Sequence, residues 1–374
     1  MRLLFCIKAM DNPGGGSERV LADVASGLVA RGHHVTVLSY DRPGGRSYYS
    51  LDPRIERIKL SIGSTADPAT MLTTLRRMAA LRKSVRAHDP DVVVGFMHSM
   101  FIPLGIALIG TSTPVIASEH IVPEHYRTRP MQALLLRLTP YLTKRITCVS
   151  EQALRSYPQS LRRMMVVIPN PVTVEPRGRA DVLGSHQHRK VLLSVGRLEP
   201  QKDHASLISA FAHIASINSD WDLRIIGEGH QRSKLESMVR DLGLEDRVQL
   251  PGATKDVAAE YLSAQLFVLS SRYESFGLTT AEALAHGLPV VGFSDCPGTN
   301  KLVRPGVNGD LAIACGIRST ALAKTLKPLM MDDALRTRLS HQAIGIPQEF
   351  QIRNVCDRWE DLLWEVTQTC KGNI

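Results

Sequence analysis

Two glutamates in the segment 270–298 have the setting of a ligand site. The segment reads SSRYESFGLTTAEALAHGLPVVGFSDCPG, and Glu274 stands in the loop expected after the apolar strand LFVLSS. A helix is expected to begin near Leu278, and its N-terminus offers N–H groups and a partial positive charge that suit a phosphate. Glu282, about one turn into this helix, can accept hydrogen bonds from a neighbouring hydroxyl pair such as that of a ribose.

The elements that must hold these residues alternate between strands and helices. From residue 190 onwards, strands are expected at 191–196, 223–227, 248–252, 266–271 and 289–293, with helices at 203–217, 231–241 and 278–286. The first part of the chain alternates likewise, with apolar or β-branched runs at 2–10, 34–40, 92–96, 114–117 and 146–149 and a helix over 18–31. This alternation predicts the α/β class, with parallel sheets and crossover helices.

The two series predict two doubly wound, Rossmann-like domains that face a cleft. The predicted divisions are a first domain at 1–170, a linker at 171–189, a second domain at 190–350, and a C-terminal helix and tail at 351–374. Ligands of such sheets bind at the carboxyl ends of the strands, so the cleft is the expected active site. One face of the tail helix is apolar, which predicts that it packs back on the fold: Val355, Trp359, Leu362, Leu363 and Val366.

The composition is that of a folded globular protein. Of the 374 residues, 44% are hydrophobic and 22% are charged, which excludes a disordered or collagenous chain. The six cysteines are too far apart for a zinc knuckle, a redox pair or a disulfide framework, and this indicates a reducing compartment. No secretory signal and no bilayer-spanning apolar run is visible, so we expect a cytoplasmic protein that is soluble or lies on a surface.

Two D-x-D triplets raise the question of a bound metal ion. Asp89-Pro90-Asp91 and Asp220-Trp221-Asp222 each stand immediately before an expected strand. Ligand sites in these sheets lie after the strands, so we interpret all four acids as loop residues and expect no catalytic metal.

The net charge of +9 lies entirely in the first 170 residues, which suggests an anionic partner. Residues 71–88 and 127–145 combine cations with apolar residues, as do helices that lie on an anionic membrane surface. The alternative for 71–88 is a helix whose apolar face packs on the sheet while its arginines are solvated. We do not expect nucleic acid, because aromatic residues make up only 5% and no recognition-helix motif is present.

In its loop–helix setting, the segment 270–298 resembles the donor-binding signature of the retaining family 4 glycosyltransferases. Further stretches fit this resemblance in the family's order along nearly the whole chain. They are PGGGSERVL (13–21), ASEH (117–120), IPNPV (168–172), VGRLEPQKDHASLI (195–208), IIGEGHQRSKLE (225–236) and VQLPG (248–252). The resemblance implies the GT-B fold, in which two Rossmann-like domains face each other.

The resemblance also implies roles for four catalytic residues. Arg197 and Lys202 would grip the donor diphosphate, since two cations in a loop after a strand can neutralise its charge. Glu274 would hold hydroxyl groups of the donor sugar, and His120 would lie beside that sugar or support the acceptor. The plain alternatives are a surface salt bridge for Arg197 and a generic surface histidine for His120.

A set of donor-binding residues is implied in the same way. Glycines let the backbone approach a phosphate, and backbone groups near Leu250 would contact the nucleobase. The set is Gly15, Gly16, Gly227, Leu250, Phe276, Gly277, Leu278, Thr279 and Glu282. One residue departs from the family's pattern. Lys301 stands where an acid near the donor is usual, which points to a different donor selectivity or a weaker activity.

The expected function is that of a retaining glycosyltransferase in polysaccharide or glycan biosynthesis. The donor would be a UDP- or GDP-sugar with a hexosyl or N-acetylhexosaminyl group, and the acceptor a glycan or a polyprenyl-diphosphate-linked sugar. No cofactor is expected, and the basic first domain would place the enzyme at the inner face of the cell membrane. The alternatives are an epimerase or phosphorylase on the same scaffold, or a sugar-nucleotide binder without transferase activity, at which Lys301 hints.

Overall fold

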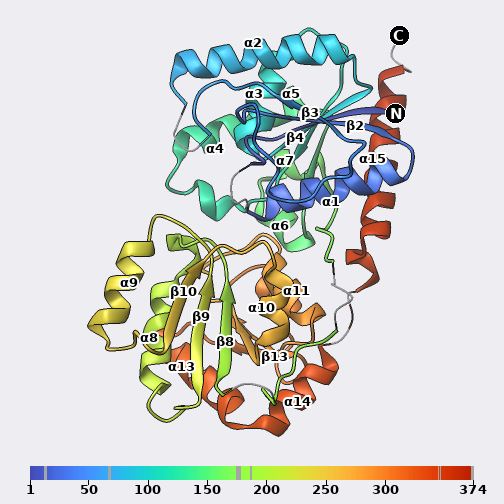
Figure 1. Cartoon of the computed structure of the whole chain (residues 1–374). Coiled ribbons are helices and arrows are strands. Elements are labelled where there is room, and N and C mark those ends of the chain that lie inside the picture. The colour runs from blue at the N-terminus through green and yellow to red at the C-terminus, as the bar shows by residue number, and fades with distance from the viewer. Residues whose placement is uncertain are drawn as a thin grey trace. The chain divides into compact units, whose positions relative to one another are not determined.

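Figure 1 shows the computed structural model, which describes residues 1–11, 15–65, 69–173, 178–185, 188–343, 345 and 347–371. The chain divides into two compact units. The first unit comprises Met1–Pro171 and Gln348–Ile374, and the second comprises Val172–Pro347. Parts of several predicted segments lie outside the described residues: residues 174–177 and 186–187 of the linker, residues 13 and 14 of the PGGGSERVL stretch, residues 372–374 of the tail, and residues 12, 66–68, 344 and 346 of the two domains.

A parallel sheet, with seven strands among the described residues, forms the centre of the first unit. The strands are β1 (Arg2–Cys6), β2 (His34–Ser39), β3 (Glu56–Lys59), β4 (Val92–Phe96), β5 (Val115–Ser118), β6 (Arg145–Cys148) and β7 (Met165–Val167). Their order in the sheet is β3-β2-β1-β4-β5-β6-β7. The winding reverses between β1 and β4, and the carboxyl ends of these two strands flank the switch point where such sheets bind ligands.

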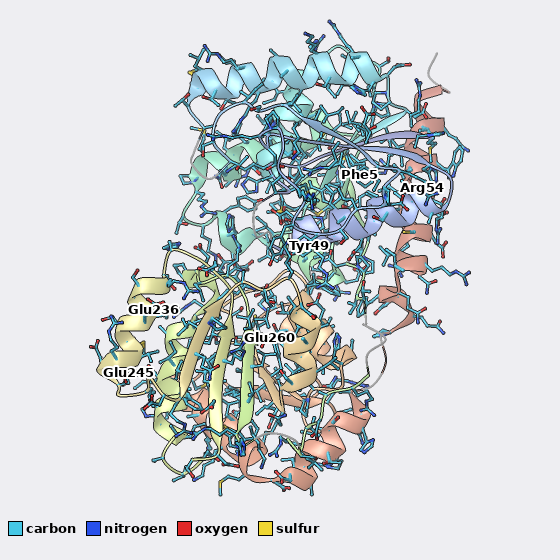
Figure 2. The ribbon with its side chains drawn as sticks, in the orientation of Figure 1. Phe5, Tyr49, Arg54, Glu236, Glu245 and Glu260 are labelled. Atoms are coloured by element: carbon cyan, nitrogen blue, oxygen red, sulfur yellow. The ribbon has the colours of Figure 1, made fainter. Side chains whose placement is uncertain are left out.

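Helices cover both faces of this first sheet. They are α1 (Gly16–Ala30), α2 (Met71–His88), α3 (His98–Ala107), η1 (Pro123–Tyr126), α4 (Pro130–Arg137), α5 (Thr139–Leu142), α6 (Glu151–Ser156), α7 (Gln159–Arg162), η3 (Gln348–Phe350) and α15 (Ile352–Lys371). Leu4 of β1 packs with Leu81 of α2 and Leu104 of α3. Phe5 points the other way, into the layer that α15 covers (Figure 2). Because both faces are buried, the strands are nearly continuous apolar runs.

The C-terminal helix α15 packs on the first unit, as predicted. The ring centroid of Trp359 lies 6.1 Å from that of Phe5. A glycine lets α1 approach closely, since a Cβ at Gly27 would lie 2.5 Å from Cys356 Sγ. At the end of α1, Arg31 forms an ion pair of 2.6 Å with Asp357. The five apolar residues of the predicted helix face are all buried.

The second unit has its own parallel sheet, ordered β10-β9-β8-β11-β12-β13. Its strands are β8 (Lys190–Val195), β9 (Trp221–Ile226), β10 (Val248–Gly252), β11 (Leu266–Val268), β12 (Val290–Phe293) and β13 (Gly309–Ala312). Its helices are η2 (Pro200–Lys202), α8 (His204–Ile214), α9 (Arg232–Asp241), α10 (Val257–Ser263), α11 (Leu278–Ala285), α12 (Thr299–Leu302), α13 (Arg318–Met331) and α14 (Asp333–Gln342). Here the switch point lies between β8 and β11, which pair side by side.

The predicted α/β class, with two doubly wound parallel sheets, is confirmed. Three strands were not predicted from the sequence, namely β3, β7 and β13. β3 reads ERIK and lies at the edge of its sheet, where charged residues are common, and β7 has only 3 residues. In the described part of the chain, none of the helices combines the length and the apolar character that crossing a bilayer requires.

Candidate active site

Two loops of the second unit meet at its switch point and bring a cation and a carboxylate together. Lys202 ends the loop after β8, and Glu274 lies in the loop after β11. Lys202 Nζ lies 2.5 Å from Glu274 Oε1, and Ser271 Oγ donates to the same oxygen at 2.6 Å. The two side chains are only 14% and 11% exposed, so each charge depends on the other for its stabilisation. The structure therefore joins two of the residues that the sequence singled out.

Backbone contacts hold these two loops against each other. Ser270 Oγ donates to the Lys202 carbonyl at 2.7 Å, and the Gln201 side chain donates to the Tyr273 carbonyl at 2.8 Å. The Arg272 amide in turn donates to the Gln201 carbonyl at 2.9 Å. Lys202 and Glu274 thus lie on loops whose positions are fixed before any ligand binds, as an electrostatic site requires.

Arg318 joins further loops at the same edge of the sheet, and it was not among the predicted site residues. Its side chain, at the start of α13, pairs with Asp295 at 2.7 Å and with Asp203 at 3.4 Å. The guanidinium also stacks on Phe293, with Cζ 3.7 Å from the ring centroid. Asp203 directly follows Lys202, so this arginine fixes the backbone that carries the lysine. No local pattern marks such a residue, because its partners lie far away in the sequence.

Arg197 lies beside a close contact between two backbone segments. At Gly227 φ is +149°, and a Cβ there would come nearer than 3.0 Å to the carbonyl oxygen of Gly196. Leu198 N donates to the Glu228 carbonyl at 2.9 Å, so the two turns run together. Arg197 itself is exposed, and its guanidinium makes no hydrogen bond or ion pair with the described residues. It is therefore a cation at the carboxyl edge that remains available for an anionic ligand.

The helix predicted near Leu278 begins there, as α11. Its N-cap is Gly277, whose φ of +83° favours glycine. The preceding Phe276 is buried, whereas Leu278 and Thr279 of the first turn are partly exposed. The first turn of α11 thus follows the Glu274 loop directly, and its N-terminal end carries the partial positive charge of the helix.

Two of the predicted donor-binding residues already contact other protein groups. The Glu282 carboxylate accepts a hydrogen bond of 2.8 Å from the Tyr261 hydroxyl and is 3% exposed. The Leu250 carbonyl accepts one of 2.9 Å from Arg232. Their roles toward a donor stay predictions. Lys301, the residue that departs from the family's pattern, is exposed on α12.

In the first unit, Gly15 and Gly16 lie at the N-terminus of α1, after β1. The Gly15 amide donates to Glu18 Oε2 at 3.0 Å, and Ser17 Oγ donates to the same oxygen at 2.8 Å. Glu18 therefore caps its own helix with a negative charge where a phosphate was expected to bind.

His120 follows β5 and is held in one orientation. Its ring stacks on that of Phe96, with centroids 5.4 Å apart, and its Nε2 lies 2.9 Å from Ser118 Oγ. Thr147 Oγ1 donates to Ser118 Oγ at 3.1 Å, which holds in place the hydroxyl that contacts the His120 ring. Burial lowers the pKa of His120 to about 4, and the ring is neutral near pH 7.

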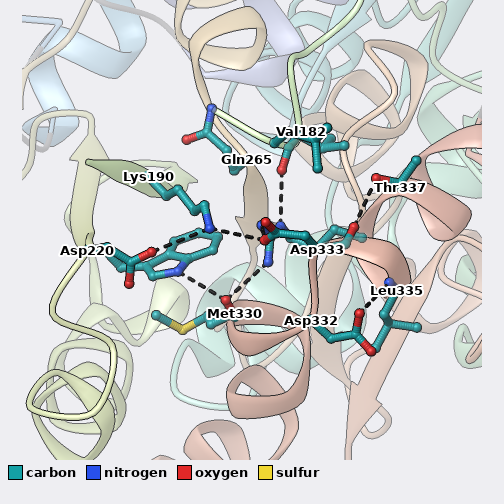
Figure 3. Close-up of polar contacts among 12 residues, drawn as sticks. Val182, Lys190, Asp220, Gln265, Met330, Asp332, Asp333, Leu335 and Thr337 are labelled. Carbon is teal, nitrogen blue, oxygen red and sulfur yellow. Dashed lines mark hydrogen bonds and ion pairs between the residues drawn. The ribbon is translucent and has the colours of Figure 1, made fainter. Parts of the chain in front are cut away.

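The first D-x-D triplet stands directly before β4, as predicted, whereas the second overlaps the amino end of its strand, because β9 begins at Trp221. Figure 3 shows Lys190 between two carboxylates, with Nζ 3.4 Å from Asp220 and 3.0 Å from Asp333. In the first unit, Arg2 pairs with Asp89 at 3.0 Å. Within the second unit, Asp220 and Lys190 lie at the amino ends of β9 and β8, at the edge of the sheet opposite the carboxyl edge that carries Lys202. Within the first unit, Asp89 and Arg2 lie at the amino ends of β4 and β1.

The helix predicted over 71–88 forms as α2, but its faces differ from the prediction. Met71 and Leu75 are 83% and 54% exposed. Arg77, in contrast, is buried, and its Nε donates to the Ile62 carbonyl at 2.9 Å. The predicted separation of apolar and cationic side chains holds in the second half of the helix, where Leu81 and Val85 are buried and Lys83 and Arg86 are exposed. It is wrong in the first half, because a neighbouring loop supplies backbone acceptors to Arg77 on the inner face.

Two known families match the chain in succession. Residues 14–176 match the family described as Glycosyltransferase Family 4, and residues 180–345 match the family described as Glycosyl transferases group 1.

Individual proteins match over nearly the full length. The phosphatidyl-myo-inositol mannosyltransferase of Mycobacterium leprae is 30% identical over 90% of this chain and 88% of its own. A Campylobacter jejuni α-1,4-N-acetyl-D-galactosaminyltransferase, named for a substrate built on diNAcBac-PP-undecaprenol, is 25% identical over 98% of this chain and 99% of its own. Among solved structures, Anabaena Alr3699/HepE in complex with UDP and glucose has a TM-score of 0.79 at 21% identity, covering 97% and 99% of the two chains.

Proposed function

The chain belongs to the family 4 glycosyltransferases, and on this basis we propose that it transfers a sugar from a UDP-sugar with retention of configuration. The sugar is a hexosyl or N-acetylhexosaminyl group, and the acceptor is a glycan or a polyprenyl-diphosphate-linked sugar. Two similarities support these choices. The HepE structure contains UDP and glucose, and the Campylobacter relative is named for an undecaprenol-linked substrate.

The observation that carries the proposal is the pairing of Lys202 with Glu274 at the switch point, 2.5 Å apart. A nucleotide-sugar donor has an anionic diphosphate joined directly to a sugar rich in hydroxyl groups. In the proposed complex, Lys202 and the exposed Arg197 stabilise the charge on the departing diphosphate, and the N-terminus of α11 adds to this field. Glu274 accepts hydrogen bonds from the sugar hydroxyls. Adjacent side chains of opposite charge suit the two halves of such a donor.

The test is transfer with a panel of UDP- and GDP-sugars, offered with octyl glycosides and with polyprenyl-diphosphate-linked sugars. We expect release of UDP that depends on the acceptor, and a product whose anomeric proton shows the configuration of the donor. Turnover with GDP-sugars alone would overturn the donor assignment, and an inverted product would overturn retention. Absence of both turnover and binding with every sugar nucleotide would overturn the proposed function.

We also propose that the transfer needs no metal ion. Asp220 and Asp222 lie at the amino end of β9, where Asp220 pairs with Lys190, and not at the carboxyl edge that carries the Lys202–Glu274 pair. Asp89 and Asp91 lie directly before β4, where Asp89 pairs with Arg2. Arg197 and Lys202 supply the positive charge instead. Transfer is therefore expected to continue at an unchanged rate in excess EDTA. Complete loss with EDTA, followed by recovery with Mn²⁺ or Mg²⁺, would contradict the proposal.

A surface of the first unit suits attachment to an anionic membrane, and we propose that the enzyme acts there, at the inner face of the cell membrane. This basic–apolar surface consists of the exposed residues Arg127, Met131, Leu134, Arg137, Leu138, Tyr141 and Lys144. Met131, Leu134 and Tyr141 are 67%, 55% and 86% exposed. Apolar side chains of this kind insert at the lipid boundary, and each nearby cation adds about 1 kcal/mol at an anionic surface.

The membrane proposal predicts co-sedimentation with vesicles that contain anionic lipid, and release by salt. The double variant Met131→Glu/Leu134→Glu is expected to bind at least about tenfold more weakly, because two apolar side chains leave the interface and two like charges enter it. Ile317→Glu is the matched control, since Ile317 is 72% exposed but lies on the second unit. Equal binding to neutral and anionic vesicles, or an equal loss in both variants, would refute the membrane surface.

A further inference from the structure

The backbone is strained at the carboxyl end of β4, next to the switch point of the first sheet. Met97 has φ 69° and ψ 150°, a region that is almost restricted to glycine. Its amide donates to the Ser118 carbonyl at 2.9 Å, and its carbonyl accepts from Phe101 at 3.0 Å. Gly95 allows the tight turn, because a Cβ there would lie 2.7 Å from Phe101 Cα. Such strain gathers at functional sites, and here it sets the direction of the next residue, His98.

His98 is the outer end of a chain of hydrogen bonds that begins in the core. The Tyr126 hydroxyl donates to Glu119 Oε2 at 2.8 Å and lies 3.0 Å from His98 Nδ1. The other oxygen, Glu119 Oε1, accepts from the Ile121 amide at 3.0 Å. Glu119 and Tyr126 are 1% and 4% exposed, whereas His98 is partly exposed. These hydrogen bonds therefore connect the buried carboxyl group of Glu119 to the partly exposed ring of His98, which a ligand can reach.

The number of protons shared among Glu119, Tyr126 and His98 determines the tautomer of His98, that is, which ring nitrogen carries the proton. An ionised carboxylate can only accept, so the single Tyr126 proton goes to Glu119. The bond between Tyr126 and His98 must then use a proton on Nδ1, which leaves Nε2 as an acceptor. If Glu119 is protonated, the direction reverses. Glu119 donates to Tyr126, Tyr126 donates to Nδ1, and Nε2 carries the proton.

Burial raises the pKa of Glu119 to about 7, so the reversal falls near neutral pH. The His98 ring stays neutral on both sides, because burial first, and then the nearby His125 and Arg129, lower its pKa to about 4. The polar groups that face His98 are His125 and Tyr126 of η1, Arg129 before α4, and Gln132 of α4. Those that face Glu119 are Tyr126, Tyr157 before α7 and Cys148 of β6.

We propose that His98 Nε2 accepts a hydrogen bond from a hydroxyl group of the acceptor saccharide, and that ionised Glu119 holds it in the accepting tautomer through Tyr126. This inference rests on the proposed function. Beyond that function, it assigns the residue that orients the acceptor and predicts that the affinity for the acceptor depends on pH. Below about pH 7 the ring presents N–H, and the hydroxyl proton loses its acceptor. A hydroxyl oriented to donate must then turn to accept from Nε2–H, so apparent affinity for the acceptor is expected to rise as the pH increases through this range.

The tautomer is tested directly by ring ¹⁵N NMR of histidine-labelled protein between pH 5.5 and 8.5. In the wild type, the Nδ1 and Nε2 signals of His98 are expected to exchange their protonated and unprotonated positions near pH 7. Glu119→Gln and Tyr126→Phe are expected to abolish this change. Tyr40→Phe is the matched control, because it removes another buried hydroxyl of the first unit, one that donates to Met100 Sδ at 3.7 Å. A His98 tautomer that is constant in the wild type would overturn the proposal.

The acceptor contact is tested with octyl N-acetylhexosaminides at saturating UDP-sugar. His98→Ala is expected to raise the KM for this acceptor about tenfold, the effect of one lost hydrogen bond, without changing the affinity for UDP. An unchanged acceptor KM in His98→Ala would overturn the inference while leaving the transferase assignment intact. If neither UDP-sugar binding nor turnover is found in the wild type, it is the proposed function that fails. Circular dichroism and melting temperature confirm that each variant is folded.

Discussion

Lys202→Ala and Arg197→Ala are each expected to reduce turnover by at least about 10²-fold, the usual effect of removing one group that stabilises developing charge. Lys202 lies 2.5 Å from Glu274, at the junction of the two loops, and Arg197 is an exposed cation on the first of them. Neither residue belongs to the apolar core, so the fold is expected to persist. Steady-state rates at saturating UDP-sugar and acceptor measure the effect.

Removing Lys202 alone leaves the Glu274 carboxylate without its cation, which destabilises the fold. A loss of stability must therefore be distinguished from a loss of catalysis. The double variant Lys202→Met/Glu274→Gln removes both charges and is expected to be stable but equally inactive. Lys327→Ala is a matched control, since Lys327 is exposed on α13 away from the loop that holds Lys202. Near-normal turnover in a folded Lys202→Ala/Arg197→Ala double variant would remove both residues from the mechanism.

The position of the site could be predicted from the sequence because it depends on local order along the chain. Each strand–loop–helix unit places its loop at the carboxyl edge, so Lys202 and Glu274 were expected there from their places after VLLSVG and LFVLSS. Their direct ion pair could not be predicted in this way. It depends on β8 and β11 being neighbours in the sheet, and pairing between strands that are distant in the sequence leaves no local pattern.

The same reasoning explains what the sequence did not reveal. The contacts of Arg318 and the chain from Glu119 to His98 join loops from different strands, so their members look like ordinary polar residues in isolation. Arg77 was expected to be a solvated cation on an amphipathic helix. Its burial depends on the backbone carbonyls that the loop near Ile62 offers, which a helical repeat cannot show.

Gly227→Ala is expected to reduce transfer at least about 10²-fold, because this position combines two requirements that only glycine meets. Its φ is +149°, and a Cβ would lie nearer than 3.0 Å to the carbonyl oxygen of Gly196, a separation that real Cβ atoms essentially never show. Backbone atoms cannot rotate away as a flexible side chain can, so one of the two turns must move. Arg197 follows Gly196 directly, and a displacement of about 1 Å at a positioned catalytic group can cost about 10²-fold in rate.

Gly243→Ala is a control that separates the clash of an added Cβ from the conformational cost of a positive φ. Gly243 also has a positive φ, of +63°, but a Cβ there would meet nothing within 4 Å. This control is expected to lose only about 1–2 kcal/mol of stability, the cost of a left-handed backbone for a residue with a side chain, and to keep its activity. Isothermal titration with UDP and transfer assays on both variants measure the difference. If Gly227→Ala binds UDP and transfers sugar as well as Gly243→Ala does, the contact between the two turns does not position Arg197, and the cation acts without a fixed backbone.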